Sequence, residues 1–159
     1  MEYVDIPKRL TSIGAFAFEN CSDLEAVYYL GSSSVTNIGE GAFRGCTSLE
    51  YVDIPKNLSC IQESTFEGCT NMEAAYYLGS SSVTSIGKRA FMNCSFLEYI
   101  DVPKKTTIIS ESAFEGCTEL ESIYYLGSSA VTIIDKNAFR GCLHLITKFK
   151  RVKIVHYLF

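Results

Sequence analysis

The sequence predicts a repeat solenoid, in which the chain coils through about six similar rungs around one continuous core. Three observations lead to this fold class. The cassette Ala-Phe-x-x-Cys, or a near variant, occurs six times, its phenylalanines recur at alternating intervals of 25 and 23 residues, and apolar residues hold fixed positions in every copy. A period in the twenties with such fixed positions is typical of a solenoid, because no single repeat can bury its apolar face alone.

The alternating intervals divide residues 1–144 into six repeats of 23 and 25 residues, so the true unit is a 48-residue pair. The short form covers residues 1–23, 49–71 and 97–119, and the long form covers 24–48, 72–96 and 120–144. Residues 145–159 depart from the pattern and form a separate C-terminal segment.

Each repeat is expected to begin with a strand. Tyr51-Val52-Asp53-Ile54 alternates polar and apolar residues, which is the period of a half-buried strand. In the short form a proline ends this strand, because proline cannot donate to a ladder of hydrogen bonds. In the long form a Gly-Ser-Ser turn follows, and the two extra residues lie in it.

In the rest of each repeat, the chain is expected to run back along the other side of the coil. Val35-Thr36-Asn37-Ile38 reads as a second, shorter extended piece. The glycines that follow this position, Gly14, Gly39 and Gly87, suit a tight bend. Residues 42–46 are then expected to form a single helical turn that places Phe43 and Cys46 on one face.

The phenylalanines and cysteines of the six cassettes are predicted to form an internal structural spine. Stacked one per rung, the cysteines would act as small buried hydrophobes. They would not bind zinc, because a linear ladder does not converge on one point. Cys60 lies at a variable position outside the spine, where it could be a free thiol. The spine consists of Phe18, Cys21, Phe43, Cys46, Phe66, Cys69, Phe91, Cys94, Phe114, Cys117, Phe139 and Cys142.

These residues resemble the BspA-like (Treponema pallidum-type) leucine-rich repeat family, and the resemblance covers about residues 1–144. The segments 36–55 and 84–103 match its pattern nearly throughout; the third short repeat departs from it at Thr106 and Ser110. The resemblance implies a curved, right-handed leucine-rich-repeat coil with strands on one face and short strands and helical turns on the other. It also implies an adhesion module at the cell surface or outside the cell, whose partner is a protein such as a host or matrix surface protein.

Stacking the rungs is expected to place two ladders on the outer strand face. Two interpretations stay open: a ligand-binding face rich in tyrosine, or tyrosines that simply favour strands and stabilise neighbouring rungs. Duplication of the 48-residue pair by itself explains why tyrosine alternates with other residues along each ladder. One ladder runs Tyr3, Ala26, Tyr51, Ala74, Tyr99 and Ser122, and the other runs Asp5, Tyr28, Asp53, Tyr76, Asp101 and Tyr124.

A row of glutamates, one per repeat, lies beside these ladders. We expect it to be a solvated acidic edge. Like charges one rung apart repel each other, and Lys8, Lys56 and Lys104 could compensate only if folding brings them close. The row consists of Glu2, Glu25, Glu50, Glu73, Glu98 and Glu121.

Charge and chemistry exclude several functions. Residues 1–144 hold all 18 acidic groups and only 10 of the 14 basic ones, so nucleic acid is not expected as a partner. The two histidines, His144 and His156, lie in no arrangement that suggests a nucleophile and its base. Repeats supply like residues, whereas a catalytic site needs unlike ones. We therefore predict no enzymatic activity, no cofactor and no metal ion.

The ends of the chain leave further alternatives open. Residues 145–159 combine four basic groups with apolar residues, which fits a cap over the last rung, a membrane-surface segment, or a disordered or out-of-frame end. The chain carries no secretory signal and no apolar run of the ~20 residues that a membrane helix needs, and its location stays undetermined.

The leading functional hypothesis is a non-catalytic protein-binding module that uses the Tyr/Asp face. The alternative is a structural spacer, or a fragment of a longer array, with no ligand of its own. In that case the open ends could drive self-association.

Overall fold

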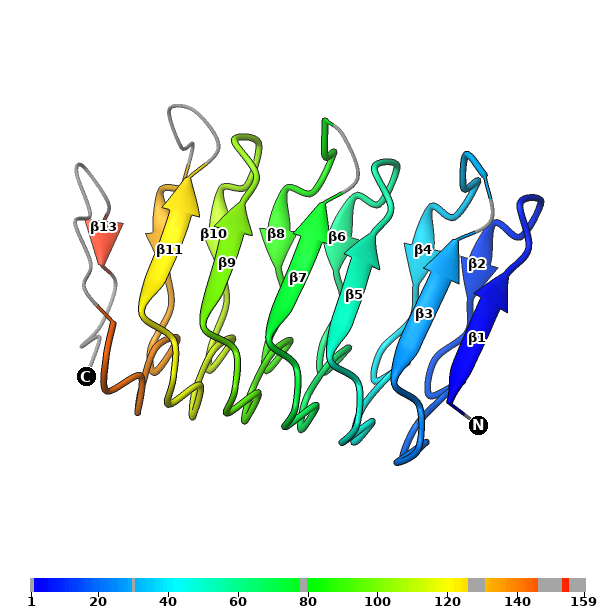
Figure 1. The fold of residues 1–159 in the computed structure, drawn as a ribbon. Helices are drawn as coiled ribbons and strands as arrows, with labels where there is room; N and C mark the ends of the chain where they lie inside the picture. Colours follow the sequence, from blue (N-terminus) through cyan, green and yellow to red (C-terminus); the bar gives the residue numbers. More distant parts are fainter. Residues whose placement is uncertain (1, 30, 78–79, 126–130, 146–152, 155–159) are drawn as a thin grey trace.

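The computed structural model is a solenoid of parallel strands (Figure 1) and confirms the predicted fold class. It describes residues 2–29, 31–77, 80–125, 131–145 and 153–154. Each rung contributes one strand to a six-stranded sheet, and neighbouring strands pair in parallel. In order, these strands are β1 (Tyr3–Ile6), β3 (Ala26–Tyr29), β5 (Tyr51–Ile54), β7 (Ala74–Tyr77), β9 (Tyr99–Val102) and β11 (Ser122–Tyr125).

Two-residue strands form the other side of the coil, as the sequence predicts. They make two smaller parallel sheets, one of two strands and one of five. The last strand, β13, pairs with β12 and comes from the C-terminal segment, whose role as a cap stays a prediction. The first small sheet holds β2 (Ser12–Ile13) and β4 (Asn37–Ile38), and the second holds β6 (Cys60–Ile61), β8 (Ser85–Ile86), β10 (Ile108–Ile109), β12 (Ile133–Ile134) and β13 (Lys153–Ile154).

The core lies between the large sheet and the small ones. Val52 and Ile54 of β5 point inward and are buried, whereas Tyr51 is exposed and Asp53 is half-buried. The spine phenylalanines stack ring on ring, with centroids 5.2–5.6 Å apart from Phe18 to Phe139. Such pairs stabilise neighbouring rungs beyond the area that they bury.

The spine cysteines link successive rungs. From Cys46 onward, each thiol donates a hydrogen bond of 3.0–3.1 Å to the carbonyl oxygen of the spine phenylalanine one rung earlier. The same carbonyl of Phe43, for example, also accepts the N–H of Cys46 at 3.2 Å. A small apolar side chain with a weak donor therefore satisfies the second lone pair of an otherwise buried carbonyl.

The predicted helical turn at residues 42–46 is wrong in detail. The segment is a series of hydrogen-bonded turns, because Gly41 (φ 57°) and Gly45 (φ 71°) are left-handed and interrupt any right-handed helix. The amide groups of Ala42, Arg44 and Cys46 bond within the rung, whereas those of Gly41, Phe43 and Gly45 bond to the next rung. The turns thus extend the inter-rung ladder around the coil.

Gly39 and Gly87, which follow short strands, must be glycines because the preceding rung lies too close to them for a side chain. A Cβ on Gly39 would lie 2.5 Å from the backbone N of Ala15, and one on Gly87 would lie 2.7 Å from the carbonyl oxygen of Ile61. Both glycines have φ outside the left-handed region. Their backbones approach the preceding rung too closely for a side chain, whereas Gly14 faces open space.

We expect Gly87→Ala to lower the free energy of unfolding by about 1–3 kcal/mol, because the added methyl group meets backbone atoms that cannot move aside. Gly14→Ala is the matched control and should change it by less than about 1 kcal/mol. Urea denaturation of both variants measures the difference. Equal losses for the two variants would contradict the close-approach explanation.

Thiol reactivity should divide the cysteines by burial. Burial raises the pKa of Cys46 and Cys142 to about 12 and that of Cys69, Cys94 and Cys117 well above its usual value. Because the thiolate is the reactive form, these five should resist a thiol-specific reagent until the protein unfolds.

Cys21 and Cys60 are only half-buried and should be modified in the native state. Mass spectrometry of the labelled protein, before and after addition of denaturant, distinguishes the two groups. Fast native labelling of Cys94 would show that the spine is open to solvent.

Candidate functional site

The outer face of the six-stranded sheet carries the residues that the sequence singles out. Strand pairing aligns Tyr3 with Ala26, Ala26 with Tyr51, Tyr51 with Ala74, and so on to Ser122. In the second ladder it aligns Asp5 with Tyr28, Asp53 with Tyr76, and Asp101 with Tyr124. Apolar neighbours in each strand point into the core, so both ladders face outward.

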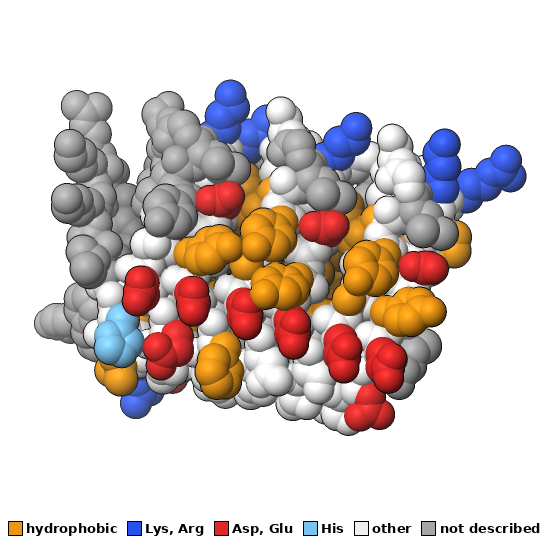
Figure 2. All heavy atoms as spheres, in the orientation of Figure 1, with side chains coloured by type: hydrophobic (Ala, Val, Ile, Leu, Met, Phe, Trp, Pro, Cys, Tyr) orange, Lys and Arg blue, Asp and Glu red, His pale blue; other side chains and the backbone are white. Residues whose placement is uncertain are grey.

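Five exposed tyrosines lie along this face in two contacting groups, Tyr3 with Tyr28 and Tyr51 with Tyr76 and Tyr99, and are here together called the tyrosine strip. The rings of Tyr3 and Tyr28 lie 6.4 Å apart, as do those of Tyr51 and Tyr76. The hydroxyls of Tyr76 and Tyr99 are 3.0 Å apart and hydrogen-bonded. Between 38% and 60% of each residue is exposed. Figure 2 shows the exposed hydrophobic side chains of this face grouped between lines of carboxylates. The side chain of Tyr124 lies outside the described residues. The strip consists of Tyr3, Tyr28, Tyr51, Tyr76 and Tyr99.

The glutamate row runs along one side of the strip. Its members are adjacent: the backbone N–H of each glutamate from Glu25 to Glu121 donates to the carbonyl of the glutamate one rung earlier, at 2.7–3.3 Å. All six side chains are exposed. The Tyr51 hydroxyl donates to the Glu73 carboxylate, and this hydrogen bond raises the pKa of Tyr51 to about 12.

Three aspartates lie along the other side of the strip. Asp5 is exposed, whereas Asp53 and Asp101 are half-buried, and burial raises the pKa of Asp53. The hydroxyls of Tyr29 and Tyr77 are buried and have no hydrogen-bond partner among the described residues. Burial raises the pKa of these two phenols, and the charges of Asp53 and Asp101 add to the effect. With the glutamate row on one side and the three aspartates on the other, carboxylates border the tyrosine strip on both sides.

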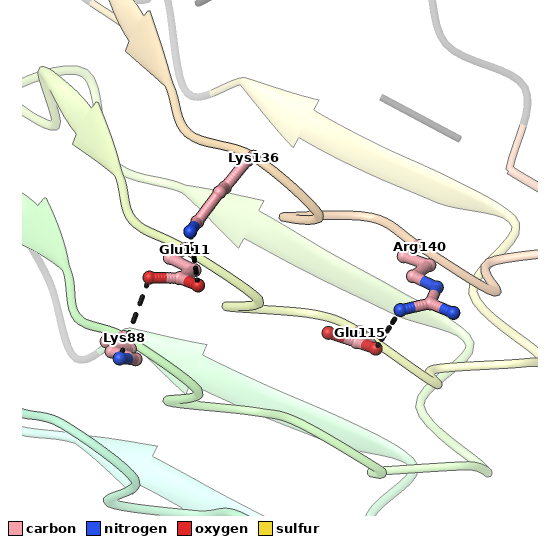
Figure 3. A network of polar contacts seen from close by, with 5 residues as sticks. All are labelled: Lys88, Glu111, Glu115, Lys136 and Arg140. Atoms are coloured by element: carbon pink, nitrogen blue, oxygen red, sulfur yellow. Dashed lines mark ion pairs between the residues drawn. The ribbon is translucent and has the colours of Figure 1, made fainter. Parts of the chain in front are cut away.

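Carboxylates on this face differ from those on the turns. Within the described part of the chain, no residue of the glutamate row and none of the three aspartates forms an ion pair. On the turns, Glu111 lies 3.2 Å from Lys136 and 3.6 Å from Lys88, and Glu115 lies 3.5 Å from Arg140 (Figure 3). Glu19 likewise pairs with Arg44. Lys136 and Lys88 lower the pKa of Glu111, so these charges are already compensated.

One functional candidate escaped the sequence reasoning. Phe96 is 56% exposed and lines a hollow of about 210 Å³ together with Glu50, Asn71 and Glu73. Its position holds Asp23, Ser48, Asn71, Glu119 and His144 in the other repeats. Comparing this one column across the six repeats would have shown that a single rung replaces a polar residue with an aromatic one.

The face offers aromatic contact surface and negative charge. Among the described residues, no three His, Cys, Asp or Glu side chains lie where they could hold a metal ion. No helix in the described ranges could span a membrane. The structure brings aromatic rings and carboxylates together over several rungs, an arrangement that can bind a partner by stacking, burial and charge.

Comparisons with known proteins agree on the fold. Solved structures with the same fold include a leucine-rich repeat protein of T. pallidum, with a TM-score of 0.64 and 24% identity over 91% of this chain and 78% of that one. A leucine-rich repeat protein of Eubacterium ventriosum matches with a TM-score of 0.72 and 22% identity over 94% of this chain and 45% of that one. One of Bacteroides ovatus matches with a TM-score of 0.54 and 23% identity, over 87% of this chain and 49% of that one.

This chain thus spans less than half of the two longer structures, and at these identities the likeness concerns the fold alone. No curated protein matches the sequence. The model of the BspA type leucine rich repeat region, in six copies, matches residues 1–77 and 28–146. The chain therefore belongs to the BspA-type leucine-rich repeat family.

Proposed function

We propose that this chain is a non-catalytic protein-binding module and that the tyrosine strip is its contact surface. The strip itself carries the proposal: five partly exposed tyrosines, from Tyr3 to Tyr99, lie on one face of the sheet in two contacting groups. Tyrosine gives a large, rigid contact area and loses little conformational entropy on binding. Contiguous exposed apolar surface commonly marks an interaction site.

Adhesion at a cell surface is the setting that the family suggests. The supporting point is general: solenoids expose extended surfaces that suit large partners. A structural spacer, the alternative, explains the tyrosines by strand preference and stacking between rungs, and it predicts no binder at this face. The two hypotheses therefore differ in an observable way.

The proposal can be tested by selecting ligands from a displayed library of protein fragments on the immobilised chain. The affinities of the recovered binders are then measured for the wild type and for Tyr28→Ala/Tyr76→Ala. Truncating a hot-spot tyrosine at an interface costs about 2 kcal/mol or more, so we expect the double variant to bind at least about tenfold more weakly.

Leu10→Ala/Ile133→Ala is the matched control, because it truncates two exposed apolar residues outside the strip and should leave affinity unchanged. Circular dichroism establishes that both variants fold. Binders that all tolerate the tyrosine substitutions within twofold, or a selection that yields none, would reject the proposal in favour of a spacer.

A further inference from the structure

We infer that the strand face binds an extended, arginine-rich segment of a partner protein, which lies along the tyrosine strip and pairs with the glutamate row. This inference rests on the proposed function, since it names the class of partner for the same surface. Three features of this face support it: the uncompensated charge of the glutamate row, the combination of tyrosine rings with carboxylates, and the hollow at Phe96.

The glutamate row carries negative charge that no ion pair among the described residues compensates. Hydrogen bonds between consecutive backbones hold the six glutamates one rung apart, a spacing of about 4.8 Å between parallel strands. Like charges this close repel one another. The six strands of the large sheet contain no Lys or Arg, and the described residues supply no ion pair to the row. The turn carboxylates Glu111 and Glu115, by contrast, have cationic partners. A basic ligand would relieve the repulsion that the described residues leave uncompensated.

The mixture of side chains selects arginine over other cations. A guanidinium group stacks flat on an aromatic ring and donates a fork of hydrogen bonds to a carboxylate, whereas the lysine ammonium is a compact, strongly hydrated point charge. Tyr51 and Glu73 illustrate the arrangement, because the phenol and the carboxylate are already in hydrogen-bond contact. An arginine above them can stack on the first and pair with the second.

The hollow beside the strip gives this preference a location. Two carboxylates, Glu50 and Glu73, line it together with the amide of Asn71 and the exposed ring of Phe96. These are the groups that an arginine side chain uses: acceptors for its N–H groups and an apolar wall for its stem. Duplication of the 48-residue pair does not account for Phe96, since Ser48 and His144 hold its place in the other long repeats.

The shape of the surface favours an extended ligand. Five steps of about 4.8 Å separate the first and last rungs, so the row spans about 24 Å. An extended chain covers that distance with about seven residues. A nine-residue peptide is therefore long enough to contact the whole row.

A second copy of this chain is the main competing occupant. Lys148, Lys150, Arg151 and Lys153 form a basic stretch in the C-terminal segment, which in another molecule could reach the same face. We favour a separate partner because lysines outnumber arginines three to one in that stretch, whereas the rings and the hollow suit arginine. Nucleic acid is excluded, because both borders of the strip are negatively charged.

The test uses the chain of residues 1–159 and three nine-residue peptides in which Arg, Lys or Glu alternates with Ser. Fluorescence anisotropy measures their binding at 50 mM and 300 mM salt. We expect the arginine peptide to bind at least threefold more tightly than the lysine peptide, to weaken with salt, and the glutamate peptide not to bind.

Two variants locate the contact. Glu50→Gln/Glu73→Gln should weaken binding of the arginine peptide at least tenfold, while glutamine still accepts the Tyr51 hydroxyl. Phe96→Ser, which restores the residue of the first long repeat, should weaken it several-fold with little effect on stability. The matched control, Glu40→Gln/Glu63→Gln, removes the same charge away from the strand face and should bind like the wild type.

Each other outcome overturns the inference. Equal weakening by the control pair would mean nonspecific charge attraction, and equal affinity for the lysine peptide would remove the preference for arginine. If the chain dimerises in sedimentation and Glu50→Gln/Glu73→Gln makes it monomeric, the occupant is a second copy. Library-selected ligands that depend on Tyr28 and Tyr76 but lack arginine would refute only this inference, whereas the loss of that dependence would refute the proposed function.

Discussion

Hydrogen bonding between the backbones of successive rungs is the constraint on which the rest of the structure depends. It operates in the large sheet and in the small sheets, and it continues through the turns, where alternate amide groups such as those of Phe43 and Gly45 bond to the next rung. Each rung is therefore held at one strand spacing from its neighbours over most of its path. Equivalent side chains must stack directly on one another, since the backbone allows no stagger between repeats.

Stacking of equivalent residues has opposite consequences inside and outside the coil. Inside, it aligns the phenylalanine rings and lets each spine thiol reach the carbonyl of the preceding rung. Outside, it brings six glutamates into one row, and none of them forms an ion pair with another described residue. The interior thus gains stability from repetition, whereas the surface accumulates charge that folding does not neutralise. A surface of this kind is suited to a ligand of opposite charge.

The large features of this fold follow from the sequence because they repeat. Alternation in Tyr51–Ile54 predicts the strand, and the intervals of 25 and 23 residues determine which residues lie in register. The turns could not be predicted in the same way. Phe43 and Cys46 suggest a helix by their spacing, and only the left-handed backbone conformation of Gly41 and Gly45 shows why no helix forms. The role of Gly87 was also hidden, because it depends on the distance to Ile61 in another rung. Contacts between rungs at this level cannot be deduced from one repeat alone.

Repetition also limits how specific the face can be. A ladder of identical residues binds equally well after a shift by one 48-residue unit, so the tyrosine strip and the glutamate row cannot by themselves fix the register of a ligand. Phe96 breaks that equivalence, since the same column is polar in every other repeat. Phe96 lines a hollow there together with Glu50 and Glu73. If the repeated surface supplies most of the contact area, this single departure is where one alignment of the partner is favoured over the shifted ones.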